Sequence, residues 1–316
     1  MDTLTGTIAV TDSGWYRHLS GNDALDEVNF WRPSAHGSVR APQFSPFLFK
    51  LKAPDNAICG FGYFARYSTL PDWLAWEAFG KGNGCASLTE MRHRINAIRE
   101  RIHYRPGSAL QQIGCILIVQ PIFFPGAAWV VQPNDWPVRT QSYKRYDLSR
   151  GEGARVWNEC LQSARALQPT GQIAGSAVAE DTGRYGTPRI VEPRLGQGTF
   201  RVCVLDAYER ACAVTEEHSL PALDAAHIRP FTDSGPNDVR NGLLLRADLH
   251  RLFDQGYITV TPDLRIEVSE RLRDDYHNGH TYYPMSGHRI HAPTSAVERP
   301  AREFLEWHNE SVFLSA

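Results

Sequence analysis

Short apolar runs bounded by Gly, Pro, Asn and Asp dominate the first half of the chain. They occupy residues 47–51, 58–64, 113–119 and 128–131. Apolar runs of about four to eight residues between turn residues are typical of buried β-strands. The pattern therefore predicts a mixed sheet or a small barrel in this half.

A helical pattern interrupts these runs between residues 88 and 102. Apolar side chains recur there at the spacing of one helix face, namely Leu88, Met91, Ile95, Ile98 and Ile102. Four arginines fall elsewhere on the same cylinder, namely Arg92, Arg94, Arg99 and Arg101. We expect an amphipathic helix with an arginine-rich outer side, which is more typical of a solvated face than of a phosphate-binding one.

The pattern changes after a stretch that is poor in large apolar residues. Residues from about 165 to 198 are rich in Gly and Pro, a composition that cannot build much core. Beyond this stretch the capping and alternation signals predict a short helix at 200–209, a helix at 246–255 closed by Gly256, a hairpin of 257–261 with 265–269, and a closing helix at 301–313.

The length of the chain fits two domains. It has 316 residues, and a domain usually has about 100 to 200. Together with the change in pattern, this predicts an α+β protein with a first domain at 1–160, a linker at 161–198 and a second domain at 199–316.

The composition is that of an ordinary globular protein, with 42% apolar and 22% charged residues. It contains no run of about 18 apolar residues that could span a bilayer, so we expect no membrane partner. The first residues lack a cationic stretch followed by an apolar core, so we expect no secretory signal and a cytoplasmic location. The six cysteines form no C-x-x-C pair, which predicts buried reduced thiols rather than disulfides or a zinc knuckle.

The charge balance places any polyanion site in a local patch. The formal net charge is −2, whereas a nucleic-acid-binding domain is usually strongly basic. Of the 33 basic residues, 29 are Arg and 4 are Lys. Guanidinium groups bind phosphate with two parallel hydrogen bonds, but a GC-rich genome produces the same bias, so both explanations stay open.

One group of residues in the second half carries a pattern that suggests catalysis. His250 and Asp254 are four residues apart in the predicted helix, so the imidazole and the carboxylate share one helix face. Such a pair is a reasonable two-point site for a divalent cation. His227 lies upstream in an apolar, extended context and needs only to fold against this helix to complete a site for acid–base and metal chemistry.

The stretches at 223–230, 241–245 and 248–254 resemble the HNH endonuclease family in the order of His, Asn and His and in the flanking residues. The resemblance covers roughly residues 199–263 and implies a ββα-metal fold. It implies that His227 is the general base that activates water, that His250 ligates the catalytic metal and that Asn241 holds the loop presenting His227. Asp254 falls where some members of the family have a further ligand.

The chain departs from the family at one position. Many members carry an Asp or His ligand immediately before the base, where this chain has Ala226. Asp224 is a candidate replacement, but strand alternation places residues 224 and 227 on opposite faces unless a bulge or turn intervenes.

Phosphodiester hydrolysis requires a base for the water and a cation that neutralises charge on the phosphate and the leaving oxygen. We expect Mg or Mn, and Ni or Zn also fits the donors. The nearest candidates for binding phosphate are Arg229, Arg246 and Arg251.

The first half carries a second, weaker resemblance. The stretches at 29–34, 49–51, 58–64 and 75–80 look similar to EVE and other PUA-like modules over about residues 10–150. These are small barrel-like domains, and the resemblance implies a reader that takes a modified base into an aromatic pocket. Candidates for stacking on the base are Trp31, Phe61, Tyr63, Trp76 and Trp136, and candidates for hydrogen bonds to its edge are Asn29, Ser34 and Asp135.

Together the two resemblances imply a modification-dependent restriction endonuclease acting on double-stranded DNA that carries 5-methylcytosine or 5-hydroxymethylcytosine. Because one HNH site cuts one strand, the reading also implies a homodimer or an assembly on DNA. Two alternatives stay open: a nuclease toxin or defence effector of relaxed specificity, and a nucleic-acid-binding protein inactivated by Ala226.

Overall fold

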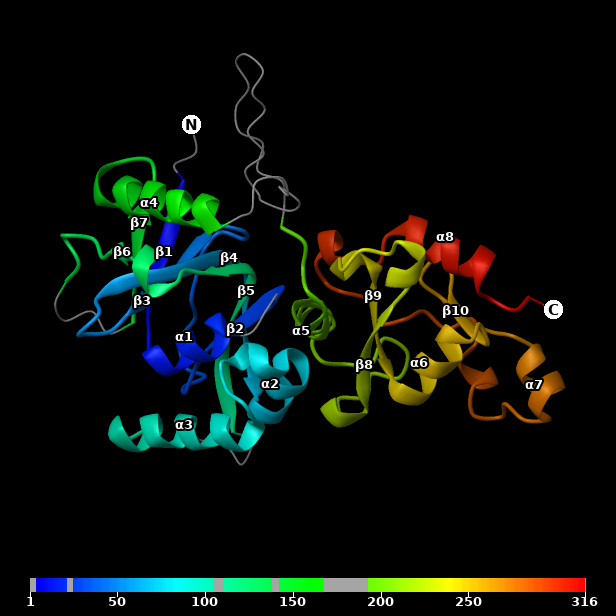
Figure 1. The fold of residues 1–316 in the computed structure, drawn as a ribbon. Coiled ribbons are helices and arrows are strands. Elements are labelled where there is room, and N and C mark those ends of the chain that lie inside the picture. The colour runs from blue at the N-terminus through cyan, green and yellow to red at the C-terminus, as the bar shows by residue number, and fades with distance from the viewer. Residues whose placement is uncertain (1–3, 22–24, 105–110, 138–141, 168–192, 316) are drawn as a thin grey trace, which may run out of the picture. The chain divides into compact units, whose positions relative to one another are not determined.

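The computed structural model describes residues 4–21, 25–104, 111–137, 142–167 and 193–315 (Figure 1). The chain divides into two compact units, one up to Thr199 and the other from Phe200 onward. Each unit is described by itself. Most of the segment predicted as a linker, residues 168–192, lies outside the described residues.

The first unit is built on a mixed seven-stranded sheet. Its strands have the order β2-β5-β4-β3-β1-β7, and β6 pairs with β4. Only β1 and β3 pair in parallel among the described strands. The bounds are β1 Thr5–Thr11, β2 Glu27–Arg32, β3 Pro46–Leu51, β4 Ala57–Pro71, β5 Gln112–Phe123, β6 Val130–Val131 and β7 Tyr143–Asp147.

The apolar runs of the sequence are the central strands of this sheet. All six residues of β3 are buried, and so are the first nine of β4. Strands covered on both faces lack polar alternation, which is why they read as continuous apolar runs. A Cβ at Gly60 would lie 2.2 Å from the carbonyl oxygen of Ile122, so the close approach of β4 and β5 requires glycine there.

Within the described residues four α-helices accompany the sheet, namely α1 Ser13–Ser20, α2 Asp72–Phe79, α3 Leu88–Arg101 and α4 Gly151–Leu167. Helix α2 packs against β2, β4 and β5, whereas α4 packs against β4, β6 and β7 (Figure 1). Helix α4 runs seven residues past residue 160, where we placed the end of the first domain. The predicted boundary at residue 160 therefore falls inside this helix. Its apolar face continues across that position, with Val156, Trp157, Cys160 and Ala164 buried.

Helix α3 forms where the apolar spacing predicts it, but two of its side chains are oriented differently. Met91 and Ile95 are fully buried, whereas Ile102 is 52% exposed just past the helix end. Arg99, expected on the outer side, is buried. Its guanidinium donates to the carbonyls of Pro33 and Gln112 and to the side chain of Gln111, which compensates for the loss of solvent.

The second unit contains a hairpin followed by a helix. Its elements are α5 Gln197–Ala207, β8 Leu223–His227, β9 Gly242–Arg246, α6 Ala247–Asp254, β10 Ile258–Val260, β11 Ile266–Val268, α7 Arg271–Tyr276 and α8 Arg302–Ser311. Helix α5 overlaps the predicted 200–209 helix, but it begins three residues earlier, inside the stretch expected to be linker, and it ends two residues before residue 209.

Helix α6 is the element that carries the predicted metal-binding residues, and it packs against β8, β9 and β10. Leu249 and Phe253 anchor its inner face. Gly256 follows with a φ of 76°, which ends the helix as predicted, since a left-handed residue at this point favours glycine.

All six cysteines are free and buried, as the absence of paired spacing predicts. In the part of the chain that the structure describes, no helix is both long and apolar enough to cross a membrane.

Candidate active site

The hairpin of β8 and β9 brings His227 and Asn241 to one end. His227 is the last residue of β8 and pairs with Gly242, the first residue of β9. Asn241 directly precedes Gly242. The loop 228–241 that joins the strands therefore begins just after His227 and ends at Asn241.

Asn241 is fully buried and ties the two ends of this loop together. Its Oδ1 accepts the backbone N–H of Arg229 at 2.9 Å, while its Nδ2 donates to the carbonyls of Arg229 and Pro236, both at 2.9 Å. All the hydrogen-bonding groups of the amide are thus used on backbone. The arrangement leaves Asn241 unavailable for substrate and makes it a structural element of the loop.

His227 is half-buried and held on two sides. Its ring stacks on Phe200 of α5, with the centroids 3.9 Å apart and the planes 12° from parallel. Its Nε2 lies 2.9 Å from Oδ1 of Asn237. Burial lowers the pKa of His227 below the ordinary value of a histidine, although the hydrogen bond with Asn237 opposes this shift. The imidazole is therefore neutral near pH 7, as a general base must be.

His250 lies between two carboxylates. Its Nδ1 is 3.4 Å from Oδ2 of Asp224, and its Nε2 is 3.4 Å from Oδ2 of Asp254. Strands β8 and β9 pair in regular register, yet Asp224 reaches the helix that carries His250. No bulge is needed for this contact. Burial raises the pKa of Asp254.

The donor types fit a divalent cation, although the described residues contain no group of three or more His, Cys, Asp or Glu side chains already in the geometry of a metal site. The reason is visible in the contacts: each carboxylate faces a different ring nitrogen of His250, so the donors do not converge. Asp224 and Asp254 are 44% and 56% exposed and can rotate toward an ion. One imidazole nitrogen with carboxylate oxygens suits Mg, Mn, Ni or Zn.

The three arginines predicted to bind phosphate differ in what they contact. Arg246 donates two hydrogen bonds to Asp248, and Arg229 donates to the carbonyl of Asp233 while lying over the ring of Trp307. Arg251 is exposed on α6, and its guanidinium has no hydrogen-bond partner among the described residues. Arg251 is thus the most accessible of the three.

Three residues in this unit escaped the sequence reasoning. Phe200 and Asn237 contact His227, as described above, and His308 of α8 stacks on Phe253 at 3.7 Å. His308 is buried and bonds to Thr259 and to the carbonyl of Phe253. Burial lowers the pKa of His308 to about 4. No sequence spacing links these residues to the motif, because the loop and α8 bring them in from a distance.

The first unit has a cavity of about 1010 Å³, lined by residues of β1, β2, β3, α3 and the segments around Gln132, Trp136 and Tyr143. Of the eight residues predicted to form a base pocket, Trp31 and Trp136 line this cavity. Its volume is at the upper end of the range for small-molecule sites.

The other six predicted pocket residues do not line the cavity. Phe61, Tyr63 and Asn29 are buried in the core. Phe61 packs against Trp157 of α4, and Asn29 donates to Asn83. Both faces of β4 are covered, so its aromatic residues fill the core. Trp76, Ser34 and Asp135 also lie outside the lining.

The cavity wall is basic. Lys50 is 3% exposed, and its ammonium donates to the carbonyl of Leu51 and to Asn56. It also lies 5.3 Å from the centre of the Trp136 ring. Burial lowers the pKa of Lys50. Among the described lining residues, Arg32, Lys52 and Arg101 are also cationic, and Asp12 is the acidic one.

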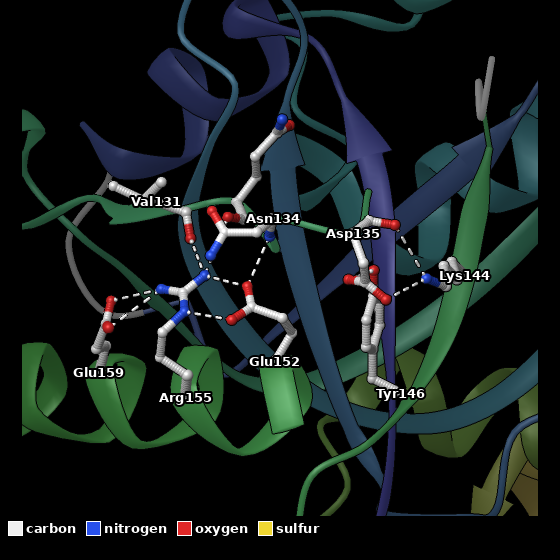
Figure 2. A network of polar contacts seen from close by, with 9 residues as sticks. Val131, Asn134, Asp135, Lys144, Tyr146, Glu152, Arg155 and Glu159 are labelled. Carbon is white, nitrogen blue, oxygen red and sulfur yellow. Dashed lines mark hydrogen bonds and ion pairs between the residues drawn. The ribbon is translucent and has the colours of Figure 1, made fainter. Parts of the chain in front are cut away.

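A polar network fixes the segment that carries Trp136 (Figure 2). Arg155 of α4 donates to Glu152, to Glu159 and to the carbonyls of Val131 and Gln132. Asp135 accepts from Lys144 and from the hydroxyl of Tyr146, and the bond from Lys144 lowers its pKa. Asp135 is therefore engaged within the unit rather than presented to a ligand.

Comparison with known proteins bears on both units. Residues 212–261 match the family model described as HNH endonuclease. The second unit thus contains a segment that matches this family. The second unit therefore carries a nuclease, a hydrolase, and the HNH nucleases generally depend on a divalent metal. The predicted α+β class, with a mixed sheet followed by the HNH domain, is confirmed.

Three solved structures are similar to the chain at low identity. The ASCH protein from Zymomonas mobilis is 12% identical, with a TM-score of 0.32 over 51% of this chain and 94% of that one. A mutant of that protein is 11% identical, with a TM-score of 0.31 over 51% and 97%. The modification dependent TagI restriction endonuclease is 11% identical, with a TM-score of 0.25 over 92% and 77%. No curated protein matches the sequence.

Proposed function

We propose that this protein is a modification-dependent restriction endonuclease. In this proposal the first unit recognises a modified cytosine, 5-methyl or 5-hydroxymethyl, in double-stranded DNA, and the HNH site cuts the backbone. The observation that carries the proposal is the HNH site itself: a neutral, oriented His227 with His250 flanked by Asp224 and Asp254.

The chemistry assigned to the chain is water activation at the scissile phosphate. His227 accepts a proton from water, the water oxygen bonds to phosphorus, and a phosphorus–oxygen bond to the leaving group breaks. His250 with Asp224 and Asp254 would hold the divalent cation, which supplies neutralisation of the charge that develops on the phosphate. Arg251 is the best placed of the predicted arginines to contact a neighbouring phosphate.

The cavity of the first unit supports the reading of DNA. Aromatic rings offer faces on which an extruded base stacks, and cationic side chains bind the phosphates beside it. Trp31 and Trp136 supply the rings, whereas Arg32, Lys52 and Arg101 supply charge. Two copies of the protein, one for each strand, would complete a double-strand break.

Binding to matched duplexes tests the reader. The His227→Ala protein should bind duplexes with modified cytosine more tightly than unmodified ones. Adding Trp136→Ala should weaken that binding about 5- to 150-fold, the loss expected for one base–aromatic stack. Trp76→Ala, a tryptophan outside the cavity, is the matched control and should retain the preference. Equal affinity of the His227→Ala protein for all duplexes would sink the proposal.

A further inference from the structure

The loop between β8 and β9 contains a second asparagine beside the predicted base. Oδ1 of Asn237 lies 2.9 Å from Nε2 of His227. An amide oxygen only accepts hydrogen bonds, so Nε2 must carry the proton in the neutral ring. The lone pair of the neutral imidazole is then on Nδ1.

The remaining contacts of His227 leave Nδ1 as its reactive atom. The ring face is covered by Phe200, which fixes the plane of the imidazole. Nδ1 has no hydrogen-bond partner within the described residues. It is also not fully buried, so it is open to solvent. Water therefore reaches Nδ1, while Nε2 is occupied.

Asn237 is held in place from both sides. The carbonyl of Pro236 accepts from Asn241, and the carboxylate of Asp238 accepts from the backbone N–H of Arg240. Further back in the loop, Gly235 donates to the carbonyl of Pro230. The backbone on either side of residue 237 is thus anchored, so its side chain is presented to His227 in a defined position.

We infer that Asn237 is a positioning residue that fixes His227 in the tautomer with its lone pair on Nδ1. The inference deepens the proposed function and rests on it for the identity of the reaction. In that reaction the proton of the attacking water moves to Nδ1, while Nε2 keeps its proton and its bond to Asn237. Asn237 contributes no proton and touches no reacting atom.

Two titratable side chains of the same site, His250 and Asp254, affect the protonation of His227. His250 opposes protonation of the ring and Asp254 favours it, while Phe200 and Asn237 are neutral. A change from Asn237 to Asp would add a negative charge directly at Nε2. It would keep the hydrogen-bond acceptor while raising the pKa of the imidazole by about one unit or more.

The experiment combines a tautomer measurement with a pH profile, both on the full chain. Nitrogen-15 NMR of the histidine rings should find the neutral His227 protonated on Nε2 in the wild type and as a mixture of tautomers in Asn237→Ala. In single-turnover cleavage Asn237→Ala should lose about 10- to 100-fold in rate. Asn237→Asp should recover most of the rate at high pH, with its acidic limb moved to higher pH.

Thr232→Ala is the matched control, because Thr232 is an exposed residue of the same loop. Among the described residues its side chain bonds only to Asp233, and it contacts neither His227 nor the groups that anchor Asn237. It should leave the tautomer and the pH profile unchanged. The inference is overturned if the wild-type ring is protonated on Nδ1, or if Asn237→Asp has the pH profile of the wild type. The NMR result does not depend on cleavage, so a protein that cuts no DNA would refute the proposed function while still deciding the tautomer.

Discussion

His250 is the residue on which the metal chemistry depends. Each of its ring nitrogens faces a carboxylate at 3.4 Å, so donor oxygens that suit a divalent cation lie on both sides of the ring. A cation would take one of these nitrogens and draw a carboxylate toward itself. This makes metal binding measurable apart from catalysis.

Addition of Mg or Mn should raise the melting temperature of the wild-type protein, and chelation should reverse it. At a metal concentration 100 times the dissociation constant, binding to the folded state contributes about 2.7 kcal/mol. His250→Ala should lose this increase because it removes the nitrogen ligand. Exposed His288 provides the control, since His288→Ala should keep the increase. Equal stabilisation of wild type and His250→Ala would place the metal elsewhere.

At the same scale, the sequence was informative where a residue's role follows from its spacing. His250 and Asp254 are one helical turn apart, and the structure places their side chains together. No regular spacing in the sequence predicts the contact of His227 with Asn237, because the path of an irregular loop brings the two side chains together. Phe61 and Tyr63 were candidates for the pocket because they are aromatic, yet whether a ring fills a core or a cavity depends on what covers each face of its strand.

At the scale of the elements, the apolar pattern predicts which strands and helices form. It predicts less well which way their side chains point. Strands β3, β4 and β5 follow continuous apolar runs, and α3 follows helical spacing. Periodicity assigns every arginine of α3 to the outer side, but Arg99 turns inward to bind the carbonyls of Pro33 and Gln112. A hydropathy pattern carries no information on where unpaired carbonyls of other segments lie.

Helix α8 stabilises the helix of the nuclease site through a buried histidine. Neutral His308 donates from Nε2 to the carbonyl of Phe253 near the end of α6, and its Nδ1 lies 2.8 Å from the hydroxyl of Thr259. Protonation would put a charge in this buried position. The histidine therefore couples the stability of the second unit to pH.

Because the folded-state pKa of His308, about 4, lies below the ordinary value of 6.5, its neutral form favours folding. The contribution of neutral His308 to the free energy of unfolding is complete above pH 6.5. As the pH falls toward 4, the free energy of unfolding decreases by about 3 kcal/mol in total. In chemical denaturation, His308→Gln should be less stable than the wild type at pH 8. The difference between the two proteins should shrink toward pH 4. A difference that stays constant with pH would contradict this role.

At the scale of the whole molecule, the proposed function assigns recognition to one of the two compact units and cleavage to the other. The cavity with Trp31, Trp136 and Lys50 belongs to the first unit, and the HNH segment belongs to the second. Substitutions in the cavity of the first unit should therefore change the preference for modified DNA without changing the rate of bond cleavage. Substitutions in the HNH segment should slow cleavage without changing that preference.

The most direct measurement is cleavage of matched plasmids, unmodified or carrying 5-methylcytosine or 5-hydroxymethylcytosine, with Mg or Mn. The wild-type protein should cut only modified plasmids. His227→Ala should lose at least about 100-fold in rate, since it removes the general base, while still binding DNA. Cleavage of every plasmid at the same rate would contradict the assignment of the first unit as a reader of modified cytosine. It would favour a nuclease of relaxed specificity. Full activity of His227→Ala would contradict the assignment of the base.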